Sequence, residues 1–179
     1  MKPITDFRFR LFVYWHTRSK TPLIVVSVIM LVSGLLVSLI YSSINDVRST
    51  KDITCLALNV YHEARGEPKA GQYAVARVTL NRAKSKHYPK EICDVVFQKN
   101  WDKRRQRYVS AFSWTELDSR PSKKSKTWQQ AWDIAESAYT GTDKSKTRDA
   151  LFYHANYIRP SWSKNKKPVA RIGKHIFYN

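Results

Sequence analysis

The chain has 179 residues, of which 32 are Lys or Arg and 14 are Asp or Glu, giving a formal net charge of +18. This length allows one ordinary domain and little besides. The charge indicates a polyanionic partner, either nucleic acid or the lipids and polymers of a cell envelope, and it supplies attraction rather than a reaction. The two cysteines have no histidine at ligand spacing, which excludes a zinc site built on them.

The first predicted element is a membrane-spanning helix. Residues 21–45 contain no charged side chain, and Leu23 to Tyr41 is mostly Ile, Val and Leu. A helix needs about 20 such residues to cross a bilayer. A cleaved signal peptide is the alternative, but the apolar run is long for one and no clean cleavage site follows it. We therefore predict an uncleaved signal anchor over residues 21–45.

The charges on either side of this segment predict its orientation. Residues 1–20 carry five cations and one acid, whereas Asp46 and Arg48 after the span cancel. The positive-inside rule makes residues 1–20 a basic cytoplasmic N-terminus. The remainder is then expected in the periplasm or cell-wall space, so that the protein crosses the inner (cytoplasmic) membrane once.

Both cysteines, Cys55 and Cys93, follow the span and therefore face an oxidising compartment. Disulfides persist in such compartments, which favours a bond between the two. In the chain-entropy model this bond would close a loop of about 40 residues and stabilise the fold by about 3–4 kcal/mol. Two buried free thiols are the alternative.

Helices are predicted next along the chain. Residues 46–52 are polar and are expected to form a short tether before a single domain over residues 53–179. Asp52 is expected to cap a first helix that Gly66 ends. Its apolar residues recur with the helical period: Ile53, Leu56, Ala57, Val60 and Ala64. Pro68 then opens a second helix, with a core face of Tyr73, Ala76, Leu80 and Ala83.

The later elements are shorter. A third helix is predicted from Pro89 to about Gln98, then a basic, mobile loop over residues 99–110 and a short strand from Phe112 to Thr115. A fourth helix, from Ser125 to Gly141, is followed by a strand at Ala150 to His154 and a terminal hairpin over residues 169–178. Helices first and short strands later predict an α+β fold rather than a parallel α/β sheet.

Glu63 is the acid with the most informative position. It follows Val60 by three residues at the edge of the apolar stripe, close to the C-terminal end of its helix. Partial burial and the helix dipole both raise the pKa of a carboxyl there. A protonated carboxyl could deliver the proton that a leaving glycosidic oxygen needs. The alternative is a structural ion pair with Arg65, Lys69 or Arg82, which the residue pattern alone favours.

Other chemistries lack their signatures. A zinc protease needs a second histidine four residues after His62, and that position is Gly66. No metal site or cofactor is predicted, because the glycines also lack a phosphate-binding arrangement. Several aromatic residues in predicted loops and short strands suit the faces of sugars or bases: Trp101, Trp114, Tyr153, Tyr157 and Trp162. Trp128 and Trp132 are assigned to the core.

Several ordered motifs resemble the cell-wall hydrolase family of the SleB type, the spore cortex-lytic enzymes. The resemblance covers about residues 53–178, and its motifs together make it specific. They are CLALNVYHEARGEP at 55–68, GQxAVAxVxLNR at 71–82, YP at 88–89, ICxVVFQ at 92–98, FSWT at 112–115, ALFYHAN at 150–156 and ARIGKHIF at 170–177.

The resemblance implies a lysozyme-like, mostly helical domain with a small β lobe. It also implies lytic transglycosylase activity on peptidoglycan, at the bond between N-acetylmuramic acid and N-acetylglucosamine. The catalytic glutamate of the family corresponds to Glu63, which outweighs the ion-pair interpretation. We expect the sugar to be held by Ser113, Thr115, Tyr153 and Asn156, with Trp114 as a stacking surface. The supporting residues are expected to be Arg65, Glu67, Asn81 and Arg82.

The chain also departs from the family pattern. FSWT is followed by Glu116-Leu-Asp118 rather than Asp-Gly, which makes Glu116 or Asp118 a candidate supporting acid, and residues 99–110 are longer than expected. A hydrolytic muramidase, a phage signal-anchor endolysin and an inactive peptidoglycan-binding module remain alternatives. A specific nucleic-acid binder is disfavoured by the span. The sequence predicts no oligomeric state.

Overall fold

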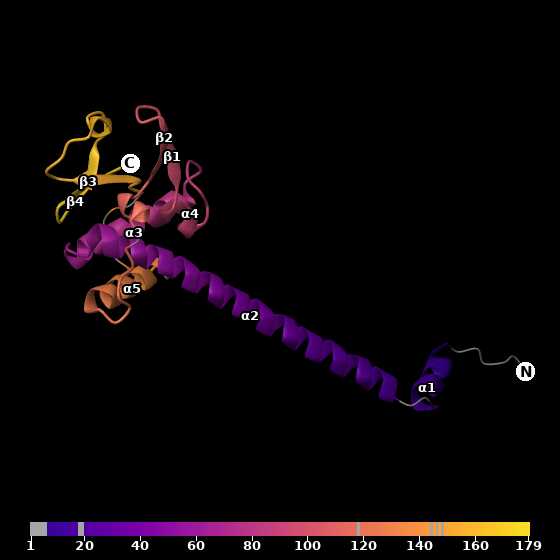
Figure 1. The fold of residues 1–179 in the computed structure, drawn as a ribbon. Helices are drawn as coiled ribbons and strands as arrows, with labels where there is room; N and C mark the ends of the chain where they lie inside the picture. The colour runs from indigo at the N-terminus through magenta and orange to yellow at the C-terminus, as the bar shows by residue number, and fades with distance from the viewer. Residues whose placement is uncertain (1–6, 18–19, 118, 144, 146, 148) are drawn as a thin grey trace, which may run out of the picture. The chain divides into compact units, whose positions relative to one another are not determined.

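The computed structural model describes residues 7–17, 20–117, 119–143, 145, 147 and 149–179 (Figure 1). It divides the chain into two units, Met1–Val47 and Arg48–Asn179. The first unit contains α1 (Phe7–Thr17) and the beginning of α2 (Thr21–Ala64). The second unit contains the end of α2 and all later elements, in which helices and small antiparallel sheets alternate. The predicted α+β class is confirmed.

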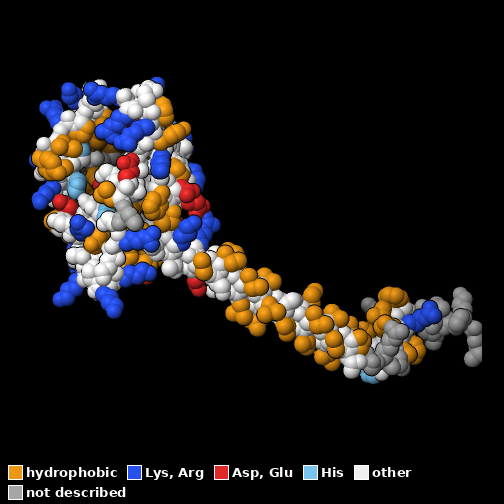
Figure 2. Space-filling view, in the orientation of Figure 1, with side chains coloured by type: hydrophobic (Ala, Val, Ile, Leu, Met, Phe, Trp, Pro, Cys, Tyr) orange, Lys and Arg blue, Asp and Glu red, His pale blue; other side chains and the backbone are white. Residues whose placement is uncertain are grey.

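The first part of α2 exposes its Ile, Val and Leu side chains, which Figure 2 shows in orange. The hydroxyls of Ser27, Ser33 and Ser43 donate to backbone carbonyls three or four residues earlier in the helix. They are thereby satisfied without water. By length and composition, α2 is long and apolar enough to cross a membrane. Helix α1 was not predicted.

The predicted tether is helical, and the expected cap at Asp52 is wrong. Residues 46–52 lie inside α2, and Asp52 is a buried residue of its interior. The stretch contains neither Pro nor Gly, so nothing in it ends a helix. The apolar run and the amphipathic stripe after it therefore form one continuous helix.

The second unit is packed around α3, which is buried on two sides. Its Ala76 and Leu80 belong to the main apolar cluster, together with residues of α2, α4 and α5. Its Ala74 and Val78 belong to a second cluster with Phe177 of the C-terminal strand. α3 therefore joins the helical part of the unit to its sheet. The helices are α3 (Lys69–Lys84), α4 (Ile92–Val96) and α5 (Lys126–Tyr139).

Two sequence-based expectations after α3 need correction. The third helix is only the five residues of α4, shorter than the predicted span to Gln98. The residues predicted as a strand at 112–115 form a 3₁₀ helix, η1 (Ser113–Glu116), in which the Thr115 hydroxyl donates to the Phe112 carbonyl at 2.8 Å. Such a local side-chain bond favours a tight turn over an extended strand. The fourth helix is confirmed, with the Ser125 hydroxyl accepting from the Trp128 amide at its start.

Residues 99–110 are a β-hairpin rather than a loop. β1 (Lys99–Asp102) pairs antiparallel with β2 (Arg107–Ser110). The Asp102 carboxylate accepts from the amides of Arg104 and Arg105 at 2.8 and 3.1 Å, and Gln106 completes the turn with φ of 50°. The many charges of this segment led us to expect a loop. The Asp102 side chain instead forms a tight turn, which Asp commonly does.

The second sheet contains β3 (Phe152–Ala155), β4 (Pro168–Ile172) and β5 (His175–Tyr178), in the order β3-β5-β4 and antiparallel throughout. The predicted terminal hairpin is confirmed as β4 and β5, and its turn uses Gly173 at φ of +58°. β3 starts two residues later than the predicted strand. A short 3₁₀ helix, η2 (Ser161–Ser163), lies between β3 and β4.

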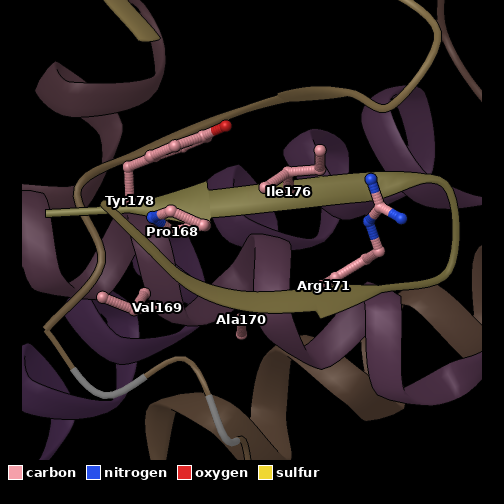
Figure 3. Close-up of a pocket in the computed structure, with 6 residues that line it drawn as sticks. All are labelled: Pro168, Val169, Ala170, Arg171, Ile176 and Tyr178. Atoms are coloured by element: carbon pink, nitrogen blue, oxygen red, sulfur yellow. The ribbon is translucent and has the colours of Figure 1, made fainter. Parts of the chain in front are cut away.

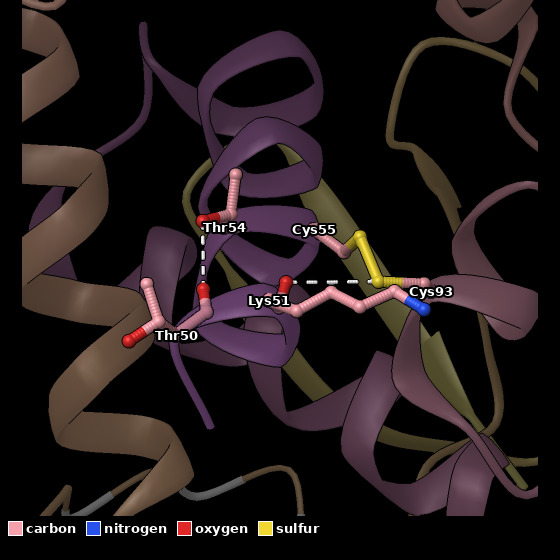
Figure 4. The surroundings of a disulfide bond; sticks show 5 residues. All are labelled: Thr50, Lys51, Thr54, Cys55 and Cys93. Atoms are coloured by element: carbon pink, nitrogen blue, oxygen red, sulfur yellow. Dashed lines mark hydrogen bonds between the residues drawn. A yellow bond between two sulfur atoms is a disulfide. The ribbon is translucent and has the colours of Figure 1, made fainter. Parts of the chain in front are cut away.

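A disulfide joins Cys55 of α2 to Cys93 of α4, with 5.2 Å between their Cα atoms (Figure 4). Both cysteines are buried in the main apolar cluster. The bond therefore ties the short helix α4 to the part of α2 that leads to Glu63.

Candidate active site

Glu63 lies in the last turn of α2, and its carboxyl contacts the three-stranded sheet of β3, β4 and β5. Glu63 is half-buried, and the hydroxyl of Tyr153 donates to its Oε2 at 3.0 Å. Tyr153 lies in β3, where it pairs with Phe177 of the central strand β5. Its ring packs edge-on against His175, with centroids 5.2 Å apart. The predicted catalytic acid and one predicted sugar-binding residue are thus brought into direct contact.

Burial raises the pKa of the Glu63 carboxyl above its ordinary value, while the Tyr153 hydrogen bond and the Arg82 charge oppose that rise. Burial, and secondly the negative charge of Glu63, hold the pKa of the Tyr153 hydroxyl well above its ordinary value. Tyr153 is therefore a proton-bearing donor at neutral pH. Glu63 has the environment of a carboxyl that retains a proton to higher pH than an exposed one.

Asn81 and Arg82 hold the chain that leads into β3. The Asn81 amide donates to the Ala150 carbonyl at 3.1 Å, and the Arg82 Nε donates to the Leu151 carbonyl at 2.8 Å. The Arg82 guanidinium also lies 5.3 Å from the ring centroid of Phe112. These contacts tie α3 to the segment that places Tyr153.

Glu67 is fixed by the turn of the terminal hairpin. Its side chain is 8% exposed, and its Oε2 accepts from the Lys174 amide at 2.7 Å. The Nδ1 of His175 lies 3.9 Å from the same oxygen, which is too far for a hydrogen bond. A Cβ added at Gly173 would lie 2.0 Å from this oxygen, so the turn requires glycine both for its φ and for space.

Arg65, the other predicted support at this helix end, is exposed. Its guanidinium lies 4.9 Å from the ring centroid of Tyr61, one turn earlier in α2. This is a cation–π distance. The contact is to a ring of its own helix, so Arg65 covers the end of α2.

Trp114 is 8% exposed and does not present a ring to solvent as a stacking surface would. Its indole N–H donates to the buried Asn59 side chain at 3.1 Å, and Asn59 in turn donates to the Thr79 hydroxyl at 3.0 Å. One ring face stacks on His62, with centroids 4.4 Å apart and planes 9° apart. A buried indole with a satisfied N–H is a packing residue. In this position it holds the residue next to Glu63.

The remaining predicted residues lie on two surface segments. Ser113 is exposed at the start of η1. Asn156 is exposed just after β3, where its backbone N–H donates to the Lys174 carbonyl at 2.7 Å. Glu116 accepts from the Ser110 amide at 3.0 Å, and this bond lowers the pKa of its carboxyl, so it is an ionised group that fixes the base of the hairpin. Asp118 lies outside the described residues.

Two histidines beside this site were missed in the sequence. His62 stacks on Trp114, and burial, followed by the charge of Arg65, lowers its pKa. Burial likewise lowers the pKa of His175, which lies between Tyr153 and Glu67. His62 adjoins Glu63 in sequence and His175 lies within the terminal motif, but nothing in their spacing indicates that one ring stacks on Trp114 and the other packs against Tyr153.

Two cavities of the second unit lie away from Glu63. One, of about 300 Å³, is lined by residues from both strands of the terminal hairpin (Figure 3): Pro168, Val169, Ala170, Arg171, Ile176 and Tyr178. The other, of about 480 Å³, is lined by residues from α2, α3, α4 and α5, among them Arg77 and Glu91. Among the described residues, no three His, Cys, Asp or Glu side chains are grouped so that they could hold a metal ion.

Comparison with known proteins gives a consistent result. The sequence model of a family described as Cell Wall Hydrolase matches residues 66–178, beginning three residues after Glu63. The spore cortex-lytic enzyme of Bacillus subtilis is 33% identical over 130 residues, covering 72% of this chain and 38% of that protein. That of Oceanobacillus iheyensis is also 33% identical over 130 residues, covering 72% and 42%. The chain thus spans about two fifths of the length of these curated relatives.

Two solved structures are similar to this one. The catalytic domain of the Bacillus cereus SleB protein has a TM-score of 0.56 and 30% identity, covering 73% of this chain and 91% of that one. The catalytic domain of the germination-specific lytic transglycosylase SleB from Bacillus anthracis has the same TM-score and identity, covering 72% and 93%. With its mostly helical fold, small sheets and matching motifs, this chain belongs to the cell wall hydrolase family and carries a SleB-like domain.

Proposed function

We propose that the chain is a lytic transglycosylase that cleaves peptidoglycan between N-acetylmuramic acid and N-acetylglucosamine, with Glu63 as its catalytic acid. The observation that carries this proposal is the half-buried Glu63 carboxyl, which has a raised pKa and accepts a hydrogen bond from the Tyr153 hydroxyl. A carboxyl protonated towards neutral pH can donate to a departing glycosidic oxygen. The lytic transglycosylase named among the similar structures supports the same reaction class.

The proposed reaction uses one carboxyl twice. Glu63 donates its proton to the glycosidic oxygen as the bond from C1 of the muramyl residue breaks, and positive charge develops on that sugar. The Glu63 carboxylate then removes the proton of the C6 hydroxyl of the same sugar. The C6 oxygen bonds to C1, which closes a 1,6-anhydro ring and returns the proton to Glu63. Tyr153 stabilises the carboxylate between the two steps, because its hydroxyl donates to Oε2.

Sugar binding is proposed on both sides of Glu63. Ser113 and Thr115 of η1 are the chain neighbours of Trp114, the residue that stacks on His62. Asn156 follows β3, the strand that carries Tyr153. Ser113 and Asn156 are exposed, so their polar groups are free to meet an acetamido sugar. Trp114 acts in this proposal by holding His62 and η1 in place rather than by stacking on the substrate.

Membrane anchoring is part of the proposal. The apolar side chains of α2 are exposed along residues 23–47, and burying so many in a bilayer removes a large unfavourable contact with water. A signal sequence near the N-terminus has the same character, so cleavage is the competing outcome. With residues 1–20 cytoplasmic, the second unit would reach the cell wall from the outer face of the inner membrane.

The test is digestion of purified peptidoglycan sacculi by the full chain in detergent micelles. The wild type is expected to release muropeptides with 1,6-anhydromuramyl ends, identified by mass spectrometry. Glu63→Gln is expected to release none, whereas Glu136→Gln, a matched change at an exposed position of α5, is expected to act as the wild type does. Reducing ends would identify a hydrolytic muramidase, and no release by the wild type would identify a binding module.

A further inference from the structure

The hairpin of β1 and β2 carries an exposed pair of aromatic rings. Trp101 and Tyr108 face each other across the two strands and are 49% and 65% exposed. Their ring centroids lie 5.2 Å apart with planes at 72°, an edge-to-face contact. Directly opposed residues of antiparallel strands share one face. The pair therefore forms a ridge that is far more exposed than the aromatic residues of the core.

The same hairpin is strongly cationic. Residues 99–107 contain five Lys or Arg residues, all exposed, and one acid, Asp102. Asp102 has Arg105 nearby, with an Nε–Oδ2 distance of 3.7 Å. The charges of Lys99 and Arg107 act on Glu116 at the base. Among the described residues, only two acids thus lie near the five cations. The uncompensated positive charge is at the turn, with Lys103 and Arg104.

The base of the hairpin is attached to the neighbourhood of Glu63. The Ala111 amide donates to the Gln98 carbonyl at 2.8 Å and closes the base. Phe97, just before β1, packs edge-on against Trp114 with centroids 5.9 Å apart. Trp114 stacks on His62, the residue before Glu63 in α2. The hairpin is therefore linked to the candidate site through two ring contacts.

We propose that this hairpin binds the peptidoglycan strand beside the bond that Glu63 cleaves. Trp101 and Tyr108 would pack against the apolar faces of sugar rings, and the cations at the turn would bind carboxylates of the stem peptides. The inference rests on the proposed function and extends it to the part of the substrate outside the reacting disaccharide. It also assigns a use to residues 99–110, which are longer here than the family pattern leads one to expect.

A glycan strand fits these features because one long polymer supplies both kinds of partner. Its sugar rings have apolar faces, and its peptide branches carry carboxylates at regular intervals. A polymer can contact the hairpin and Glu63 together, since the two are linked through Phe97, Trp114 and His62. An anionic lipid surface would satisfy the cations and the rings as well, and the experiment distinguishes it.

The experiment uses the full chain in detergent micelles and measures initial cleavage rates over a range of sacculus concentrations. Trp101→Thr/Tyr108→Thr removes both rings and keeps residues that favour strands. We expect it to raise the half-saturating concentration about tenfold, with the maximal rate changed less than twofold. Tyr139→Ala, at an exposed ring on α5, is the matched control and is expected to change neither quantity.

The cations are tested with Lys103→Ala/Arg104→Ala, and Lys123→Ala/Lys124→Ala, an exposed pair outside the hairpin, is the control. The first pair is expected to raise the half-saturating concentration about threefold at low salt and to lose this effect at high salt. Sacculi whose stem-peptide carboxylates have been converted to amides with a carbodiimide and ammonia should abolish the difference. The ring variant should remain impaired on them.

Several outcomes would overturn the inference. One is equal half-saturation for the ring variant and wild type, and another is a cation effect that survives conversion of the stem-peptide carboxylates to amides. A third is that phosphatidylglycerol added to the micelles slows digestion by the wild type but not by the variants, with no difference between them on sacculi when the lipid is absent, which would assign the hairpin to lipid. An inactive wild type would instead contradict the proposed function. The hairpin would then be tested by sedimentation with sacculi, in which weaker binding of the ring variant than of the wild type would support the inference and equal binding would overturn it.

Discussion

Glu63 and Glu67 lie four residues apart at the junction of α2 and α3, and both carboxylates receive a hydrogen bond from the same sheet. Glu63 accepts from a side chain, the Tyr153 hydroxyl of β3. Glu67 accepts from the backbone, the Lys174 amide in the turn between β4 and β5. A phenolic hydroxyl can turn its hydrogen towards or away from a carboxyl, whereas the direction of a backbone N–H is fixed by the fold. The first arrangement suits an acid that changes its protonation, and the second suits a structural brace.

The largest expected effect comes from exchanging the two carboxyls for amides. Glu63→Gln removes the transferable proton, so cleavage of sacculi should fall by about 10³-fold or more. Glu67→Gln keeps an acceptor for the Lys174 amide, so activity should stay within a few-fold of wild type. Both are measured as initial rates with soluble muropeptide release. If Glu67→Gln were the inactive variant, the two roles would be reversed.

A smaller effect, on stability, is expected from Gly173→Ala. Its positive φ costs an L residue about 1–2 kcal/mol, and the added Cβ would meet the Glu67 carboxylate. We expect a total loss of about 3 kcal/mol in the free energy of unfolding, measured by denaturant titration.

The same change in a Glu67→Ala background isolates the contact. In that background only the backbone cost of the positive φ should remain. Gly173→Ala should therefore lower the free energy of unfolding by about 1–2 kcal/mol less than it does in the wild type. Equal losses in the two backgrounds would show that Glu67 does not brace the turn.

The sequence predicts much of the helical scaffold because its information is local. The periodic stripe of Ile53, Leu56 and Val60, the start of the fourth helix at Ser125 and the terminal hairpin each depend on neighbouring residues. The errors arose where a local signal was misread. Charge concealed the turn made by Asp102, and a polar stretch without Pro or Gly was taken for a tether.

The candidate site was less predictable, because its residues meet through tertiary contacts. Glu63 and Tyr153 are 90 residues apart in sequence, and only the family motifs made one the expected acid and the other an expected sugar-binding residue. No pattern distinguishes the acid that meets a phenol from the one that meets an amide. The burial of Trp114 was likewise invisible, because an aromatic residue in a short motif looks the same whether it faces solvent or Asn59.

Tyr153→Phe tests the side-chain donor with a moderate expected effect. The Tyr153 hydrogen bond favours the ionised carboxyl and opposes the rise in the pKa of Glu63. Its loss should raise that pKa further. Cleavage that needs protonated Glu63 falls as pH rises through this pKa, so the descending limb of the pH–rate profile should move to higher pH. A several-fold lower maximal rate is also expected. A limb that stays in place would exclude Tyr153 as the partner that tunes Glu63.

The smallest expected effect is a pH-dependent gain in stability for Glu63→Gln. Because burial raises the pKa of Glu63 in the folded chain, the folded state binds more protons than the unfolded state between the two pKa values. The stability of the wild type therefore declines as pH rises from the ordinary glutamate value through the raised one, and it is constant above. Glutamine does not titrate, so the variant lacks this decline.

The difference between the two proteins is expected to be smallest at acidic pH and to grow towards neutral pH. Each unit by which the two pKa values differ contributes about 1.4 kcal/mol. The difference in stability between the wild type and Glu63→Gln is measured by denaturant unfolding of both proteins at a series of pH values, with Glu136→Gln as the exposed control. A variant that became less stable than the wild type as pH rose would mean that folding favours the ionised form of Glu63. Glu63 would then resemble a brace such as Glu67, and the distinction between the two carboxyls would fail on thermodynamic grounds even if their activities differed.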